Sequence, residues 1–508
     1  MSTGTYVLSV DCGTQSSRAV VWDLSGNPVS EGRTKLKVLE PRLGWYEQDA
    51  DTWWPATRDA IRQALEGIDS AEIVAMGVTH QRETFAPVSR DGRPLRNAPL
   101  YMDHRCLPQV AEAKRTIGAE RLHEITGKVP CYLHSIFKIL WIMENEPHIH
   151  EQTFKYLDVQ AYLLRRLVGR YVTSYVSADS TSLVNIRTRS WDTDLMSEFG
   201  LGPEQFPELR APGETAGRVT AEAAKETGLP EGLPVVAIGG DGVCAALGSN
   251  TLSTSRAFII IGTFTALGTY APEYVIGDSF RTLCSCVAGA YNLEANIAGG
   301  HIISWFLENF SGGDPDSDTE VSWEKAAAEI PPGAQGLVTL PHWTGVLAPS
   351  WDSLSHGIVA GWSSTHTRAH FYRSILEGII FEHKLLAEEM TSALGTEFED
   401  IVFVGGGAKS PLWGQIMADV FDTPISLSRT VEVTSLGAAM VVATAMGYYG
   451  SLFDAAATMT HTEPAYEPDT RTAVRYRDLY EQVYKPLFPR IEDIMSILGK
   501  TTFETSSG

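Results

Sequence analysis

The residues best suited to chemistry near the start of the chain lie in "LSVDCGTQSSRAVVWD", residues 8–23. The alternation of Leu8 and Val10 predicts a half-buried strand that ends on the carboxylate of Asp11. A loop of Gly, Thr, Gln and Ser follows, and Arg18 opens the next strand. Small residues let backbone N–H groups approach an anion, while hydroxyls and an arginine add donors and charge. An ordinary hairpin turn, in which Asp11 only caps a backbone group, is the structural alternative.

Two further glycine-rich corners lie in the second half of the chain. "RAFIIIGTFTALGTY" repeats the strand, Gly-Thr loop and strand at Gly262-Thr263, and "IVFVGGGAKSP" places Gly406-Gly407 before a helix start at Ser410-Pro411. Three such corners could clamp a polyphosphate across a cleft. Asp11 would then hold Mg²⁺, which prefers carboxylate, water and phosphate oxygens. Close packing of a helix on a strand is the alternative explanation for the glycines.

Asp241 stands where the apolar strand in "LPVVAIGGDGVCAALGS" meets the next helix. Phosphoryl transfer to an alcohol needs a carboxylate that orients the hydroxyl and accepts its proton. We expect the helix N-terminus to keep this carboxylate ionised at neutral pH. A simple N-cap aspartate is the structural alternative.

A polar segment, "THQRET" (79–84), follows a predicted strand, so its side chains should project from the carboxyl edge of a sheet, where ligands bind. Arg82 and Glu83 together offer the donors and acceptors that a polyol requires. In an extended chain they would point to opposite sides, and one of them could then be a surface charge. "YMDHRC" (101–106) adds Tyr101, Asp103 and Arg105, or is a solvated loop.

The familiar nucleotide motifs are absent or incomplete. The Walker pattern fails at "GKT" (499–501), because Ile494 occupies the position of its first glycine. "GDGVCA" formally matches the dinucleotide pattern, but Ile261 and Gly262 stand where an acid should hold a ribose. A nicotinamide-dependent dehydrogenase is therefore disfavoured.

The elements that would position these residues alternate between strands and helices. In the first half we expect strands at 6–11, 18–23, 29–39 and 73–80 and helices at 51–67, 108–117 and 151–168. In the second half we expect a long core helix at 374–390. This order predicts an α/β sheet, and the repeated strand–Gly-Thr–strand device predicts two related lobes.

The bulk composition sets the class of protein. The chain of 508 residues has 44% hydrophobic and 20% charged residues and a formal net charge of −22, which is typical of a globular protein and disfavours binding to nucleic acid or a membrane. No signal peptide or membrane-spanning run is recognisable. Six scattered cysteines are expected to be reduced thiols of a cytoplasmic protein.

Seven motifs in order resemble those of the FGGY carbohydrate kinases over nearly the whole chain. They are "VDCGTQSSRAVVWD", "GWYEQDADTWW", "HQRET", "GGDGVCAALG", "IIIGTF", "WTGVLAPSWD" and "VGGGAKSPLW". The resemblance implies an α/β protein of two ribonuclease-H-like lobes, as in actin, hexokinase and Hsp70, with a central cleft. We place an N-terminal lobe at 1–248, a C-terminal lobe at 249–500 and a disordered tail at 501–508.

The resemblance also implies roles for individual residues. Asp241 would be the catalytic base, and Asp11 would be associated with Mg²⁺. The substrate-binding residues would be Gln81, Arg82, Glu83, Tyr101, Asp103, Tyr132 and Asp241. ATP would be bound by Gly13, Thr14, Gln15, Arg18, Gly262, Thr263, Gly300, Ser304, Gly406 and Gly407.

Departures from the family pattern concern the substrate and the nucleotide. Gly242 and Ala266 stand where glycerol kinases carry a glutamine and a phenylalanine, so we expect room for more than three carbons. Pro411 replaces a polar residue beside the expected adenosine. The predicted activity is ATP-dependent phosphorylation of a ketopentose, such as xylulose or ribulose, or of a related polyol of about four to six carbons. Glycerol kinase is one alternative, and an actin-like ATPase without a sugar substrate is another. A homodimer is one assembly that the sequence allows.

Overall fold

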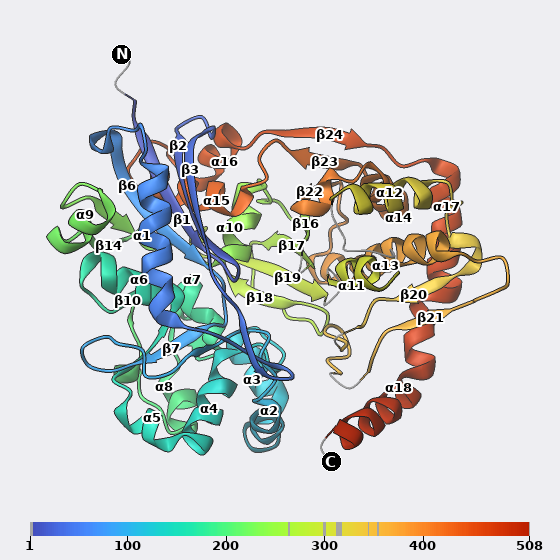
Figure 1. Ribbon diagram of the computed structural model, residues 1–508, viewed down its shortest axis with the longest axis horizontal. Helices are drawn as coiled ribbons and strands as arrows, with labels where there is room; N and C mark the ends of the chain where they lie inside the picture. The colour runs from blue at the N-terminus through green and yellow to red at the C-terminus, as the bar shows by residue number, and fades with distance from the viewer. Residues whose placement is uncertain are drawn as a thin grey trace.

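Two sheets of like topology, one in each half of the chain, form the framework of the computed structural model (Figure 1). The structure describes residues 4–262, 265–297, 301–310, 317–343, 345–352 and 355–506. The first sheet has the order β14 (Thr215–Arg218), β15 (Pro234–Val236), β6 (Ile73–His80), β1 (Tyr6–Cys12), β2 (Ser16–Asp23) and β3 (Pro28–Lys35). The second has the order β18 (Arg281–Cys284), β19 (Tyr291–Ile297), β17 (Thr265–Ala271), β16 (Arg256–Ile261), β22 (Asp400–Val404), β23 (Ile425–Ser428) and β24 (Thr462–Tyr466).

The pairing within the sheets confirms that the lobes are related. In each lobe, three antiparallel strands (β1–β2–β3 and β16–β17–β19) are followed by two strands parallel to the first (β6 and β15, then β22 and β23). This is the predicted ribonuclease-H-like arrangement. Because β1 and β16 occupy equivalent positions, the loops that follow them are equivalent too.

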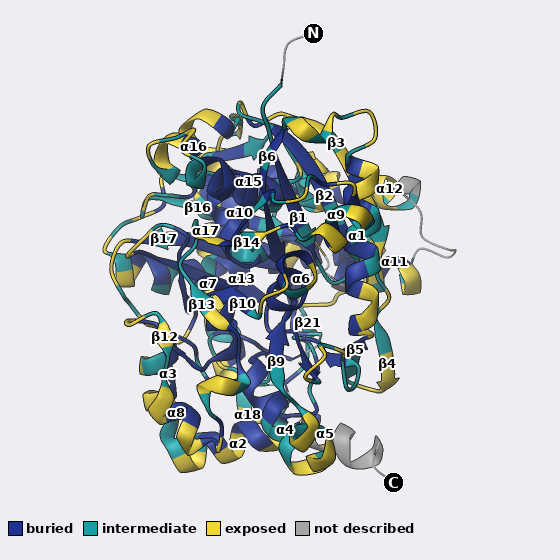
Figure 2. Ribbon diagram, turned by 90° about the vertical axis from the view of Figure 1, so that its left-hand side faces the viewer, coloured by how far each residue is buried: buried dark blue, intermediate teal, exposed yellow. Residues whose placement is uncertain are grey.

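Helices cover both faces of each sheet, which is why β1 is buried along most of its length rather than on alternate residues. In the first lobe, α1 (Trp53–Ala64), α6 (Val159–Val168) and α9 (Ala221–Thr227) pack on the outer face. In the second lobe, the long helix α13 (Arg368–Leu394) is the core element, with α14 (Pro411–Phe421) and α17 (Thr470–Leu479) beside it. Figure 2 shows the resulting buried interior beneath exposed outer helices.

Two helices between the sheets join the lobes. α10 (Asp241–Gly248) and α15 (Val433–Ala445) cross so closely that a Cβ on Gly248 would lie 1.8 Å from the carbonyl oxygen of Val433, and a Cβ on Gly437 would lie 1.9 Å from that of Cys244. Only glycine permits this approach. A buried hydrogen bond of 2.7 Å between the hydroxyls of Ser9 and Ser435 also links the lobes. The last residue of α10 thus lies against the first residue of α15.

A subdomain is inserted between β6 and β15 and lies at the lower left of Figure 1. Its helices are α2 (Leu107–Ala113), α3 (Ala119–Thr126), α4 (Ser135–Asn145), α5 (Pro147–Gln152) and α8 (Thr193–Glu198). They surround a separate apolar core. The segments around Tyr101 and Tyr132 belong to this subdomain, which is part of the first lobe.

Several expected elements differ in extent from the structure. The helix expected at 151–168 is divided by β9 (Lys155–Asp158), which pairs with β7 (Phe85–Val88) before Asp158 caps α6. The strand expected at 29–39 ends at Lys35, and α2 gives way to a π-helical turn at Lys114–Gly118. α18 (Lys485–Ser506) includes residues 501–506, where we expected a disordered tail. Long-range strand pairing and packing, which local sequence does not display, decide these boundaries.

Candidate functional site

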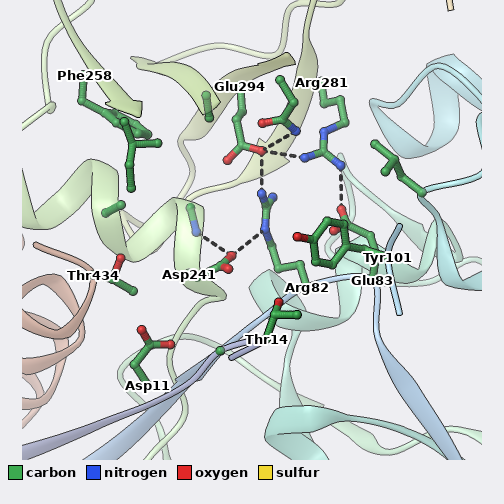
Figure 3. A pocket seen from close by; sticks show the side chains of 17 residues that line it. Asp11, Thr14, Arg82, Glu83, Tyr101, Asp241, Phe258, Arg281, Glu294 and Thr434 are labelled. Atoms are coloured by element: carbon green, nitrogen blue, oxygen red, sulfur yellow. Dashed lines mark hydrogen bonds and ion pairs between the residues drawn. The ribbon is translucent and has the colours of Figure 1, made fainter. Parts of the chain in front are cut away.

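A cavity of about 230 Å³ lies where the end of β1, the start of α10 and the strands of the second lobe meet (Figure 3). We call it the inter-lobe cavity. Predicted residues that line it are Asp11, Gly13, Thr14, Arg82, Glu83, Tyr101 and Asp241. The other lining residues are Leu133, Gly242, Ala245, Phe258, Ile260, Ala266, Arg281, Glu294, Asn296 and Thr434. Residues that are far apart in the sequence thus line one cavity.

Asp11 is the last-but-one residue of β1, and its carboxylate is incompletely satisfied. Its Oδ1 atom is buried without a hydrogen-bond partner among the described residues. Burial, with a smaller contribution from the nearby Asp241, raises the pKa of Asp11 to about 7 against the opposing effect of Arg18. A carboxylate held in this way would gain from a cation.

The loop after β1 is fixed from behind by two glutamines. The hydroxyl of Thr14 donates to Gln81 Oε1 at 2.9 Å, and Gln81 Nε2 donates to Gln48 Oε1 at 2.7 Å. Gln48 Nε2 in turn donates to the carbonyl oxygen of Thr14. Gln81 therefore supports the loop and does not line the cavity, although we predicted a substrate contact for it.

Gln15 and Arg18 also lie outside the lining of the cavity. Gln15 is exposed, and its carbonyl oxygen accepts from the backbone N–H of Leu36. Arg18 forms an ion pair with Glu432, which precedes α15 in the other lobe. In this conformation Arg18 joins the lobes beside the loop.

Asp241 is the first residue of α10, as predicted. Its Oδ1 accepts from the backbone N–H of Gly242 at 2.8 Å and from Arg82 Nε at 3.2 Å, while 42% of the side chain remains exposed toward the opening. Burial nevertheless raises the pKa of Asp241; Arg82 opposes that rise and Glu294 adds to it. The direction of this pKa shift does not test the expectation that Asp241 is ionised at neutral pH, which stays a prediction. A raised pKa makes the Asp241 carboxylate a stronger proton acceptor than an ordinary aspartate.

Arg82 and Glu83 both face the cavity. Glu83 adopts a positive φ of 56°, so the chain is not extended here and the two side chains need not point to opposite sides. Each makes an ion pair with the second lobe: Arg82 Nη2 with Glu294 Oε1 at 2.5 Å, and Glu83 Oε1 with Arg281 Nη1 at 2.6 Å. The surface-charge alternative is excluded, since both residues are buried.

Arg281 and Glu294 complete this network, and our sequence reasoning missed them. Arg281 Nη2 donates to Glu294 Oε1 at 2.6 Å, and Asn296 Nδ2 donates to the same oxygen at 3.2 Å. Burial favours the neutral acid, but Arg82 and Arg281 together lower the pKa of Glu294 to about 2. A signal was present: Asn292, Glu294 and Asn296 alternate with apolar residues in "YNLEANI", which places three polar groups on one face of a buried strand.

Two other predicted substrate contacts lie away from the cavity. Asp103 is fully buried and binds Arg105 and the backbone N–H of Tyr46. Tyr132 packs edge-on against His104 and lines a different cavity, beside the 346–351 loop. Of the aromatic residues predicted for the substrate, Tyr101 is the one whose ring borders the inter-lobe cavity.

A second cavity, of about 440 Å³, lies within the C-terminal lobe. The predicted nucleotide residues Gly262, Ser304, Gly406 and Gly407 line it together, with Glu320, Glu324 and Trp413. Ile260 lines the inter-lobe cavity and Ile261 this C-terminal cavity, so the end of β16 passes between the two. Thr263 and Gly300 lie outside the described residues.

The room expected beside Gly242 is taken by another side chain. A Cβ on Gly242 would lie 2.1 Å from Glu294 Oε2 and 2.9 Å from Arg82 Nη2. Ala266, in contrast, does line open space. Because Gly242 has no side chain, the carboxylate of Glu294 from the second lobe occupies the space beside it. The pocket is therefore not enlarged at position 242.

The described residues fit a magnesium ion that is held mainly by phosphate oxygens of the nucleotide and by only one or two carboxylates of the protein. No cluster of three or more His, Cys, Asp or Glu side chains suited to a metal occurs in the part of the chain that the structure describes. Mg²⁺ is usually held by one or two carboxylates together with phosphate oxygens and water. The unsatisfied Oδ1 of Asp11 is a suitable ligand of that kind.

The structure defines a protein of two related α/β lobes with a cavity between them, and comparisons with known proteins identify the family. The models of the N-terminal and C-terminal domains of the FGGY family of carbohydrate kinases match residues 6–248 and 257–446. The chain therefore belongs to the FGGY family of carbohydrate kinases. This membership favours an ATP-dependent kinase over an actin-like ATPase.

Curated relatives include enzymes for more than one substrate. The chain is 27% identical to the xylulose kinase of Bacillus subtilis, covering 97% of this chain and 98% of that one. It is 30% identical to the glycerol kinase of Thermococcus gammatolerans, covering 94% and 96%. The family is thus shown, while the substrate is not fixed by these relatives.

Solved structures show the same fold. Ligand-bound xylulose kinase from Lactobacillus acidophilus has a TM-score of 0.91 at 22% identity (97% and 100% covered). A gluconate kinase from the same organism has 0.89 at 23% identity (97% and 98% covered), and Plasmodium falciparum glycerol kinase with ADP has 0.84 at 23% identity (95% and 98% covered). No helix among the described residues is long and apolar enough to span a bilayer.

Proposed function

We propose that this kinase transfers the γ-phosphoryl group of ATP to a hydroxyl of a ketopentose, such as xylulose or ribulose, or of a related polyol of about four to six carbons. The observation that carries the proposal is that Asp11, Thr14, Arg82, Glu83 and Asp241 line one cavity between the lobes. The alternative acceptor is glycerol, supported by the Arg82-Glu83 pair and by curated glycerol kinases among the relatives.

Asp241 is the proposed catalytic base. Its raised pKa and its exposure to the cavity suit a group that orients the acceptor hydroxyl and takes its proton. Arg82 holds Asp241 through Nε, so the carboxylate keeps one orientation while its other oxygen remains free of the protein bonds described above. Most of the barrier would be lowered by positioning and by neutralisation of charge.

The phosphate groups are proposed to lie between the loop at Gly13-Thr14 and the first turn of α15. Backbone N–H groups at both sites are suited to anions, and Thr434 of α15 lines the cavity together with Asp11 (Figure 3). The adenosine would occupy the C-terminal cavity at Gly406 and Gly407. Mg²⁺, held by Asp11, would neutralise phosphate charge.

Three accompanying proposals rest on the sequence. The chain is expected to act in the cytoplasm and to allow a homodimer. The lobe boundary is placed at 248/249, at the end of α10, although α10 itself packs against strands of the second lobe.

An assay of ADP release over a panel of acceptors tests the proposed function. Glycerol, erythritol, xylulose and ribulose are each supplied with ATP and Mg²⁺, and the phosphate ester is identified by mass and ³¹P NMR. We expect ADP release to be stimulated by a four- or five-carbon acceptor more than by glycerol. Steady ATP hydrolysis that no acceptor stimulates would contradict the proposal.

A further inference from the structure

Glu294 enters the inter-lobe cavity through space that only a glycine leaves open. It lies on β19 of the C-terminal lobe and is 3% exposed, yet its Oε2 approaches the first turn of α10 at Gly242. Any side chain at position 242 would collide with that oxygen at 2.1 Å. The pairing of Gly242 with Glu294 therefore builds a carboxylate into the wall beside the proposed catalytic base.

The two oxygens of Glu294 have different environments. Within the described part of the chain, Oε1 accepts from Arg82, Arg281 and Asn296, which fixes the carboxylate group. These donors leave Oε2 facing α10 (Figure 3). A fixed, ionised oxygen of this kind is an acceptor for a ligand hydroxyl.

The charges of the cavity disfavour an anionic acceptor. Four lining carboxylates, those of Asp11, Glu83, Asp241 and Glu294, face the guanidinium groups of Arg82 and Arg281. Each guanidinium already binds two of these carboxylates. Arg82 Nη1 and Arg281 Nε have no hydrogen-bond partner among the described residues, but both guanidinium charges are already balanced by carboxylates. A ligand carboxylate would therefore add to an excess of negative charge.

We propose that Glu294 is a specificity-determining residue that accepts a hydrogen bond from a hydroxyl of the acceptor, remote from the reacting hydroxyl, and selects uncharged polyols and ketoses against sugar acids such as gluconate. This inference rests on the proposed function. It adds that recognition of the acceptor is completed from the C-terminal lobe. Arg82 and Arg281 act as positioning residues for the carboxylate.

The test uses the full-length protein and two readouts. The first is the rise in unfolding temperature caused by each ligand without ATP, and the second is kcat and KM with ATP and Mg²⁺. The ligands are xylulose, ribulose and erythritol as uncharged acceptors and gluconate as the sugar acid. We expect the uncharged acceptors to stabilise the wild type and to be phosphorylated, and gluconate to do neither.

Two variants probe the residue itself. Glu294→Gln keeps the shape but removes the charge, and Gly242→Ala displaces Oε2. Both should raise KM for the preferred uncharged acceptor about tenfold or more while kcat changes less than threefold. Glu463→Gln, at an exposed ion pair with Arg429, is the matched control and should leave both constants unchanged.

The outcomes separate the two proposals. If the wild type phosphorylates an uncharged acceptor but Glu294→Gln keeps KM within twofold, the inference is wrong and the proposed function stands. If gluconate is the preferred acceptor, the inference and the acceptor named in the proposed function are both wrong. If uncharged ligands stabilise the wild type but not Glu294→Gln, and no ADP is released, the inference stands and the proposed function fails. If no uncharged ligand binds in either assay, the inference is also overturned. The unfolding temperature without ligand shows whether each variant is folded, and Glu294→Asp, which retains the charge but withdraws Oε2, gives a second measurement should Glu294→Gln not fold.

Discussion

Arg82 Nε donates to Oδ1 of Asp241 at 3.2 Å, so the proposed proton acceptor is held by a cation of its own lobe. The same guanidinium reaches Glu294 of the other lobe through Nη2 at 2.5 Å. One arginine thus connects the proposed base to the wall that faces it. Changes at Arg82 should therefore affect the chemical step as well as binding of the acceptor.

Replacement of Asp241 by asparagine should remove the proton acceptor while keeping an oxygen for Arg82. We expect kcat to fall by about 10² or more, which is the usual contribution of a general base. ATP affinity, measured by calorimetry, should stay within about threefold of the wild type. Near-normal turnover would contradict the role assigned to Asp241.

Replacement of Arg82 by methionine should leave Glu294 and Asp241 without a shared counterion. We expect a loss of about 3 kcal/mol in the free energy of unfolding, since it breaks a buried pair. Because Arg82 lowers the pKa of Asp241, its removal should raise that pKa and move the acidic limb of the kcat profile to higher pH. Arg82→Lys, which retains a charge, should shift the limb less; an unchanged profile in both variants would show that the two residues are uncoupled.

Asp11 should link metal binding to pH. Its pKa of about 7 means that protons compete with Mg²⁺ below neutrality, so the apparent affinity for Mg²⁺ in the ATP assay should fall about tenfold per pH unit below that value. Without a cation, the folded state binds the extra proton between about pH 4 and 7, so stability from this group falls as pH rises through that window. Asp11→Asn should thus unfold with a free energy about 1 to 4 kcal/mol higher than the wild type at pH 8, and lose Mg²⁺-dependent activity. A variant that is no more stable at pH 8 than the wild type would contradict the burial of charge at Asp11.

Two adjacent glycines offer a matched test of the proposed adenosine site. A Cβ on Gly406 would meet nothing within 4 Å, whereas a Cβ on Gly407 would lie 2.9 Å from Cβ of Ile261. Gly406→Ala should leave the unfolding temperature unchanged and raise KM for ATP several-fold, because the new methyl group would occupy the C-terminal cavity. Gly407→Ala should instead lower stability by about 1 to 3 kcal/mol through overpacking. An unaltered KM for ATP in Gly406→Ala would argue that adenosine binds elsewhere.

The two lobes and the glycine-rich loops at the ends of their strands could be predicted, because strong local sequence patterns encode them. The strand before Asp11, the Gly-Thr repeat at Gly262 and the helix start at Ser410-Pro411 each combine an apolar strand with a residue that ends or begins an element. Strands that end in this way place their loops at one edge of a sheet. The position of Asp241 on the first turn of α10 follows from the same logic.

Some predicted residues lie behind the cavity, because their side chains bond to partners that spacing in the sequence does not reveal. Gln81 and Asp103 carry suitable polar groups but turn toward Thr14 and Arg105, behind the cavity. The helix expected through Lys155–Asp158 became a strand because β7 lies alongside it. In each case a contact between distant segments outweighed the local pattern.

The sequence alone determined a two-lobed α/β kinase of the FGGY family, with an acid at the end of its first strand and another at the start of α10. Only the tertiary structure decided what surrounds that second acid. Arg82 and Glu294 form a buried ion pair although they are 212 residues apart in the sequence. No local pattern in the sequence can predict a contact between residues so far apart. The physical reason is the crossing of α10 and α15 at glycines, which brings the two sheets close enough for one lobe to place a carboxylate in the wall of the other.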